Sequence, residues 1–249
     1  IAFRSLRLFE DCLGAALADT SLPLVRRLLW AADIVDRLDA TQSDHLLPRN
    51  FHETLIHHRD RAREEAENCG IRRPNLGRLE RVLLRQFLGL GTPGAERHLT
   101  ADSFWVRTRA RLHGLGLGLR HVWGAGALPA GAARVFFRQV AQVHTLHLAP
   151  ESEELIARYL ATRLASRAYC GQAGQDATVV AGARLTLLLA AAVLWQAKLR
   201  AAAEERDAVT HADVREGVIQ TDKAFGHMAG LQLAPARRAL GLVTRPGWP

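Results

Sequence analysis

Residues 179–197 read VVAGARLTLLLAAAVLWQA, the one stretch of this 249-residue chain long and apolar enough to resemble a membrane span. Arg184 lies in its first third, and an arginine inside a bilayer span costs about 2.5–3.5 kcal/mol. Gly182, Thr186 and Gln196 make the stretch less apolar still. We therefore expect a central helix of a soluble bundle and no membrane span.

Apolar residues recur elsewhere at intervals of three and four, the spacing of helices that bury one face. No long run alternates apolar and polar residues, as a half-buried strand would. The predicted fold class is all-α, an irregular bundle of about eight or nine helices around the long apolar helix. It forms a single domain over 1–249, or two sub-bundles over 1–125 and 126–249. We expect helices near residues 4–19, 24–38, 50–70, 79–90, 102–113, 129–148, 150–169, 176–207 and 210–226.

Three sets of residues are typical of helix N-termini. Ser21 precedes the helix expected at Leu24, and Asn50 stands three residues before Glu53. Thr210 and Asp213 have the same spacing. In such a capping box, each side chain accepts a hydrogen bond from the other residue's backbone N–H. We expect a helix to begin at each of the three positions.

The chain is basic and arginine-rich, with 33 Lys+Arg against 25 Asp+Glu and a formal net charge of +8. Of the basic residues, 31 are arginines and 2 are lysines. The arginines are spread through the chain, usually near Glu or Asp, rather than gathered in one block. This distribution disfavours nucleic acid as a partner. A basic nucleic-acid-binding helical protein stays open as the lesser alternative.

The three cysteines, Cys12, Cys69 and Cys170, lie far apart and form no CxxC pair. This pattern predicts free thiols in a reducing cytoplasm and no cysteine-based metal site. His52 and His57 fail the HExxH spacing by one residue, so that they point to different sides of a helix. No phosphate-binding loop or GxSxG motif occurs. The sequence thus contains no complete catalytic site and no metal site.

The C-terminal third carries the most distinctive pattern. RYLATRLASRAYCG (158–171) precedes the long apolar helix, and THADVREGVIQTDKAFGH (210–227) follows it. This arrangement resembles bacterial cysteine-cluster proteins, a zinc- or iron-chelating family whose relatives include flagellin lysine-N-methylases. The resemblance covers the last 80 residues, with a fainter likeness before them. It implies that this chain is the helical C-terminal part of such a protein and lacks the cysteine cluster.

The resemblance implies Zn, Fe or S-adenosylmethionine as cofactors of a longer protein and none in this chain. The chain begins at Ile1 and its only methionine is Met228, from which we expect a missing N-terminal region. We expect a non-catalytic binding or scaffold module whose partner is another protein or that missing cysteine-rich region. The alternative is part of an S-adenosylmethionine-dependent protein-lysine methyltransferase.

Six polar residues of the C-terminal third form the candidate site. In the interpretation that we favour, they are structural: the arginines pair with Glu154 or Asp222, the tyrosine hydroxyl bonds to backbone, and the cysteine is a small buried side chain. The six are Arg158, Arg163, Tyr169, Cys170, Asp222 and His227.

Overall fold

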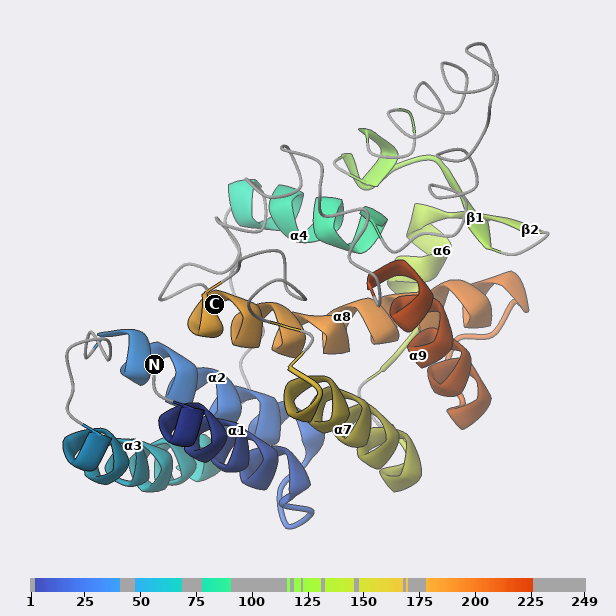
Figure 1. Ribbon diagram of the computed structural model, residues 1–249. Coiled ribbons are helices and arrows are strands. Elements are labelled where there is room, and N and C mark those ends of the chain that lie inside the picture. Colours follow the sequence, from blue (N-terminus) through green and yellow to red (C-terminus); the bar gives the residue numbers. More distant parts are fainter. Residues whose placement is uncertain are drawn as a thin grey trace. The chain divides into compact units, whose positions relative to one another are not determined.

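The computed structural model describes residues 3–40, 48–68, 78–90, 116, 119–121, 123–130, 133–145, 148–167, 169 and 178–225. Most of these residues are helical (Figure 1), which confirms the all-α class with one long apolar helix. The helices are α1 (Phe3–Ala18), α2 (Leu24–Ala40), α3 (Pro48–Asn68), α4 (Arg78–Leu90), α6 (Phe137–Gln142), α7 (Pro150–Ala165), α8 (Val179–Ala203) and α9 (His211–Phe225). The strands are β1 (Ala127–Ala130) and β2 (Ala133–Phe136).

The described residues fall into two compact units, each made of separate parts of the sequence. The first unit takes its described residues from Ile1–Pro74 and Glu153–Ala190. The second takes its described residues from Asn75–Ser152 and Ala191–Val243. The helix α8 contributes residues to both units, because the division falls within it, after Ala190.

The core of the first unit is built on α1, α2 and α3, each of which contacts the other two. Every helix contributes apolar side chains spaced three or four residues apart, as expected for helices that bury one face. Fully buried examples are Phe9 and Leu13 on α1, Ile34 and Leu38 on α2, and Leu55 on α3. The spacing read from the sequence therefore predicts these helices to within two residues at most ends.

Two buried arginines join the helices of the first unit. Arg27 of α2 donates to the carbonyl oxygens of Leu22 (2.7 Å) and Leu17 (3.2 Å), and it pairs with Glu153 of α7. Arg184 of α8 reaches Asp36 and Asp39 of α2 at 2.6 and 3.1 Å. Each guanidinium is more than nine-tenths buried in the protein, and paired carboxylates offset the loss of its hydration.

The helix α8 has the length and hydropathy of a membrane span. Buried helices of water-soluble proteins share those properties, and most of α8 is covered by the rest of the chain. The charge of Arg184 is met by the two carboxylates of α2. The expectation that α8 does not cross a membrane is consistent with this pairing and stays a prediction.

The second unit is centred on aromatic side chains. His121, Phe137 and Trp195 are buried, and their ring centroids lie 5.2–6.4 Å apart. Phe87 of α4 and Phe225 of α9 form another pair, with centroids 5.1 Å apart. These separations are typical of favourable aromatic pairs.

The helix expected over 129–148 is wrong in its first half. Gly124 and Gly126 have φ values of +64° and +89°, at which a helix ends. The chain then forms an antiparallel hairpin in which Leu128 faces Val135. Both side chains are buried, so the apolar residues that indicated a helix are those that one face of the hairpin buries. Only the short α6 remains of the expected helix.

The three expected helix starts have different outcomes. The capping box of α9 is confirmed, because the backbone N–H of Thr210 donates to Asp213 (2.8 Å) and that of Asp213 to Thr210 (3.4 Å). The cap at Ser21 is wrong, since the first N–H of α2, that of Leu24, donates to Glu153 of α7 (3.0 Å). The cap at Asn50 is also wrong, because Asn50 lies inside α3.

A glycine in α9 allows close packing against α8 in the second unit. A Cβ atom placed at Gly217 would lie 2.5 Å from the carbonyl oxygen of Val193. Real side chains do not approach backbone so closely, so any larger residue must push the two helices apart. Gly14 of α1 has no neighbour within 4 Å of the same position and serves as a control.

We predict that Gly217→Ala lowers the free energy of unfolding by about 2 kcal/mol, the usual effect of overpacking. Gly14→Ala is expected to raise it by about 0.5–1 kcal/mol, because alanine restricts the unfolded chain more than glycine does. Urea denaturation followed by circular dichroism measures both. Equal effects of the two substitutions would contradict the close contact at Gly217.

Candidate functional site

The structure places the described residues of the predicted polar cluster in two different units. Arg158 and Arg163 lie on α7 and Tyr169 follows it, all in the first unit, whereas Asp222 lies on α9 in the second. Arg158 is exposed and pairs with Glu154 one turn earlier at 3.8 Å, one of the two acidic partners expected for it. Cys170 and His227 lie outside the described residues.

Tyr169 belongs to a buried polar contact centred on Glu10 of α1. Its hydroxyl donates to the Glu10 carboxylate at 3.2 Å, a side-chain partner that the structural interpretation did not name. Arg167 also donates to Glu10, through Nε and Nη2, each at 3.0 Å. The forked geometry of these charge-assisted bonds fixes the segment after α7 against α1. Arg167 and Tyr169 lie far from Glu10 in the sequence, so no local sequence pattern could have predicted this contact.

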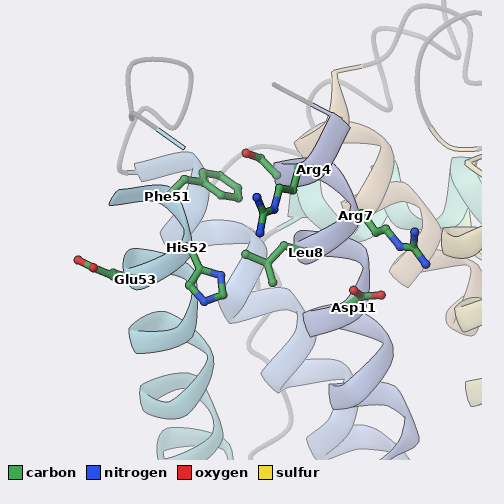
Figure 2. A pocket seen from close by; sticks show the side chains of 8 residues that line it. Arg4, Arg7, Leu8, Asp11, Phe51, His52 and Glu53 are labelled. Atoms are coloured by element: carbon green, nitrogen blue, oxygen red, sulfur yellow. The ribbon is translucent and has the colours of Figure 1, made fainter. Parts of the chain in front are cut away.

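A groove with a volume of about 700 Å³ lies between α1 and α3. Figure 2 shows Arg4, Leu8, Phe51 and His52 gathered in the space between the two helices. Arg7 and Asp11 point outward from α1, and Glu53 points outward from α3 (Figure 2). The groove is completed by Ser5, which is buried.

The charged groups of this groove differ from those further along α3. Among the described residues, Arg4, Arg7, Asp11 and His52 make no hydrogen bond or salt bridge. Further along α3, Arg59, Arg61 and Arg63 each pair with a carboxylate at 2.7–3.1 Å. Within the groove, the Arg4 guanidinium and the His52 imidazole thus keep hydrogen-bonding capacity that no described residue uses. Sequence analysis missed this site because α1 and α3 are brought together only by folding.

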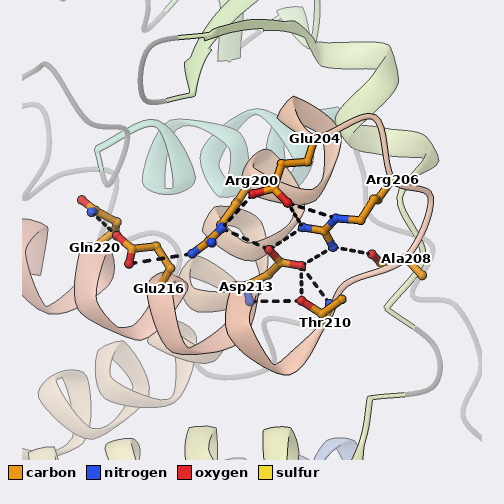
Figure 3. A network of polar contacts seen from close by, with 8 residues as sticks. All are labelled: Arg200, Glu204, Arg206, Ala208, Thr210, Asp213, Glu216 and Gln220. Atoms are coloured by element: carbon orange, nitrogen blue, oxygen red, sulfur yellow. Dashed lines mark hydrogen bonds and ion pairs between the residues drawn. The ribbon is translucent and has the colours of Figure 1, made fainter.

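A second polar cluster surrounds Asp213 of α9, as Figure 3 shows. Its carboxylate is completely buried and accepts from Arg206 through two bonds of 2.6 and 2.7 Å. Thr210 contributes its backbone N–H and its hydroxyl, both at 2.8 Å. Arg200 of α8 approaches at 3.3 Å. The exposed Glu204 then accepts from both arginines.

This network, formed by Arg200, Glu204, Arg206, Thr210 and Asp213, holds the start of α9 against the end of α8. Burial acts to raise the pKa of Asp213, but the hydrogen bonds from Arg206 and Thr210 outweigh burial and the pKa is lowered. The hydrogen bonds from Arg206 to Asp213 also raise the pKa of Arg206, because they stabilise its protonated, charged form. The carboxylate is ionised at neutral pH and surrounded by donors, so we assign the network a structural role.

The described residues contain no group of three His, Cys, Asp or Glu side chains placed to hold a metal ion. The prediction that this chain binds no metal stays a prediction, because His147 and the cysteines other than Cys12 lie outside that part of the chain. Cys12 is buried and not in a disulfide, and burial raises the pKa of its thiol.

Comparison with models of protein families, with curated proteins and with solved structures finds no match to this chain. The resemblance to cysteine-cluster proteins therefore remains a sequence-based hypothesis, as do the methyltransferase alternative and its cofactors. We therefore infer the function of this chain from the geometry of the described residues.

We predict that Asp213→Asn lowers the free energy of unfolding by about 3 kcal/mol at pH 7, because it leaves two arginines without their buried carboxylate. The folded-state pKa of Asp213 lies below the unfolded value of about 3.9. The ionised carboxylate therefore stabilises the fold above that value, and its contribution is lost as pH falls toward the folded-state pKa. The difference between wild type and variant should shrink below about pH 4.

The matched control is Glu204→Gln, which removes an exposed carboxylate from the same two arginines. Solvent already screens this group, so we expect a much smaller loss of stability. Urea denaturation at pH 7, 5 and 3.5 measures both variants. A wild-type advantage over Asp213→Asn that is the same at all three pH values would contradict the assignment.

Proposed function

We propose that this chain is a helical binding module whose groove between α1 and α3 takes a segment of another protein. The observation that carries the proposal is that Arg4 and His52, which have no hydrogen-bond or salt-bridge partner in the described part of the chain, lie beside apolar side chains. Arg4 and His52 face the groove beside Leu8 and Phe51 (Figure 2). An apolar centre with a polar rim is the usual anatomy of a protein-binding surface.

The groove indicates the chemistry of the segment that fits it. Leu8 is half-buried and offers apolar contact to a partner side chain. The Arg4 guanidinium and the His52 imidazole are hydrogen-bond donors that match a carboxylate, and arginine binds carboxylates in a two-pronged geometry. We infer a peptide segment that places an acidic side chain next to an apolar one.

The outward charges add orientation to such an interaction. Arg7 and Asp11 lie on one side of α1, and Glu53 lies on the far side of α3 (Figure 2). A bound segment whose two ends extend past the helices would meet Arg7 and Asp11 beyond α1 and Glu53 beyond α3. Complementary charges of this kind govern specificity and association rate more than affinity.

A library of random dodecapeptides displayed on phage, selected against the whole chain, tests the proposal. We predict enriched peptides that carry Asp or Glu beside an aromatic or aliphatic residue. In fluorescence polarisation, Arg4→Ala should weaken binding of a selected synthetic peptide at least tenfold, which is roughly the value of a charge-assisted hydrogen bond. His52→Ala should weaken it by a smaller factor.

Arg61→Ala is the matched control, because Arg61 lies on α3, is exposed, and pairs with Glu65 outside the groove. We expect it to bind the selected peptide as wild type does. Selected peptides that bind Arg4→Ala and wild type equally would refute the proposal, as would a selection that enriches none.

A further inference from the structure

The hairpin of the second unit carries a surface that the groove does not explain. This surface, here called the hairpin surface, consists of Arg120, Trp123, Arg134, Phe136 and Arg138. All five are exposed, and the two aromatic side chains strongly so, Trp123 by 74% and Phe136 by 51%. Large aromatic side chains are normally among the more buried residues of a domain, so their joint exposure points to an interaction.

The hairpin register places Arg134 and Phe136 on one face. Val135, between them, is buried against Leu128, and successive residues of a strand point to opposite faces. Arg134 and Phe136 therefore both face outward. The Arg138 guanidinium lies over the Phe136 ring at 5.7 Å from its centroid. The outward face thus carries Arg134 and an aromatic ring that has the Arg138 guanidinium against it.

The helical turn before the hairpin extends this face. Arg120 donates to the carbonyl oxygen of Ala127 at 2.7 Å, and Ala127 is the cross-strand partner of Phe136. The Arg120 side chain also lies against Gly126: a Cβ atom placed on that glycine would be 3.3 Å from it. Trp123 follows Arg120 by three residues, which places both on the same side of a helical turn.

The sequence interval that contains the hairpin is positively charged and lacks acidic residues. Residues 103–150 contain six arginines and no Asp or Glu. Among the described residues, Arg120, Arg134 and Arg138 form no salt bridge. In the first unit, by contrast, Arg27, Arg37, Arg167 and Arg184 all pair with carboxylates. The even spread of arginines along the sequence concealed this difference.

We propose that the hairpin surface binds a single-stranded polynucleotide, a function beyond the proposed binding of a protein segment. Guanidinium groups that have no carboxylate partner among the described residues are suited to phosphate oxygens, which they bind through two parallel hydrogen bonds. Exposed aromatic rings stack with unpaired bases, and alternation of cations and rings is the common feature of single-strand binding surfaces. Bases in a duplex are already stacked, so the rings favour single strands.

The same observations fit a lipid surface and an acidic peptide less well. Among the described residues the sheet has only two strands, so each strand has an open edge whose backbone groups would lose hydration in lipid. A peptide made of acidic residues alone would account for the arginines but not for the exposure of Trp123 and Phe136. Both are therefore used as competing ligands in the test.

Fluorescence anisotropy with a labelled twenty-nucleotide oligothymidylate at 50 mM salt tests the proposal on the whole chain. Wild type should bind this strand more tightly than a duplex of equal length. Trp123→Ala and Phe136→Leu should each weaken binding about tenfold, through lost stacking. Arg134→Ala/Arg138→Ala should lower the slope of log K against log salt by about 1.4, or about 0.7 for each lost phosphate contact.

The double variant Arg59→Ala/Arg61→Ala is the control: it removes two arginines of α3 that have carboxylate partners. It makes the same change in net charge and should leave binding near wild type. Thermal melting of each variant shows that the fold is retained. Absence of oligonucleotide binding at 50 mM salt would overturn the proposal, as would equal losses in the control variant. Tighter binding to phosphatidylserine vesicles or to polyglutamate than to the oligonucleotide would also overturn it.

Discussion

The long helix α8 sets the condition that the rest of the chain has to meet. It is apolar on all sides and is buried along most of its length, so other elements must cover it almost completely. Its residues before Ala191 belong to the first unit and the later ones to the second. Two of its buried polar side chains have partners: Arg184 meets two carboxylates of α2, and the Thr186 hydroxyl donates to the carbonyl of Gly182.

Arginine–carboxylate pairs at the ends of helices supply the specific contacts within each unit. Glu153 of α7 accepts the first N–H of α2 and lies beside Arg27. Glu10 of α1 accepts from Arg167, and Asp213 of α9 accepts from Arg206. Buried charges need such partners because an unpaired one loses far more hydration than it regains. An arginine-rich chain thus uses many of its cations internally.

Cations without a carboxylate partner among the described residues mark the surfaces to which we assign function. Arg4 faces the groove of the first unit, and Arg120, Arg134 and Arg138 belong to the hairpin surface of the second. Neither surface was predicted as a site. The groove depends on contact between α1 and α3, and the hairpin was expected to be helical. The acid-free interval over 103–150 was the available signal for the hairpin surface, and it is visible only when charge is counted locally.

The spacing of apolar residues was enough to predict the helical class and the extents of α1, α2, α4 and α9 to within about two residues. The cap formed by Thr210 and Asp213 was also predictable, because it depends on contacts between near neighbours in the sequence. The sequence did not predict the hairpin. Each strand has only four residues and buries one apolar side chain, Leu128 or Val135, and so short a pattern cannot be distinguished from the buried face of a helix. Only the tertiary structure decided which arginines are paired. Such pairs, as between Glu10 and Arg167, join residues far apart along the chain, and no local pattern records them.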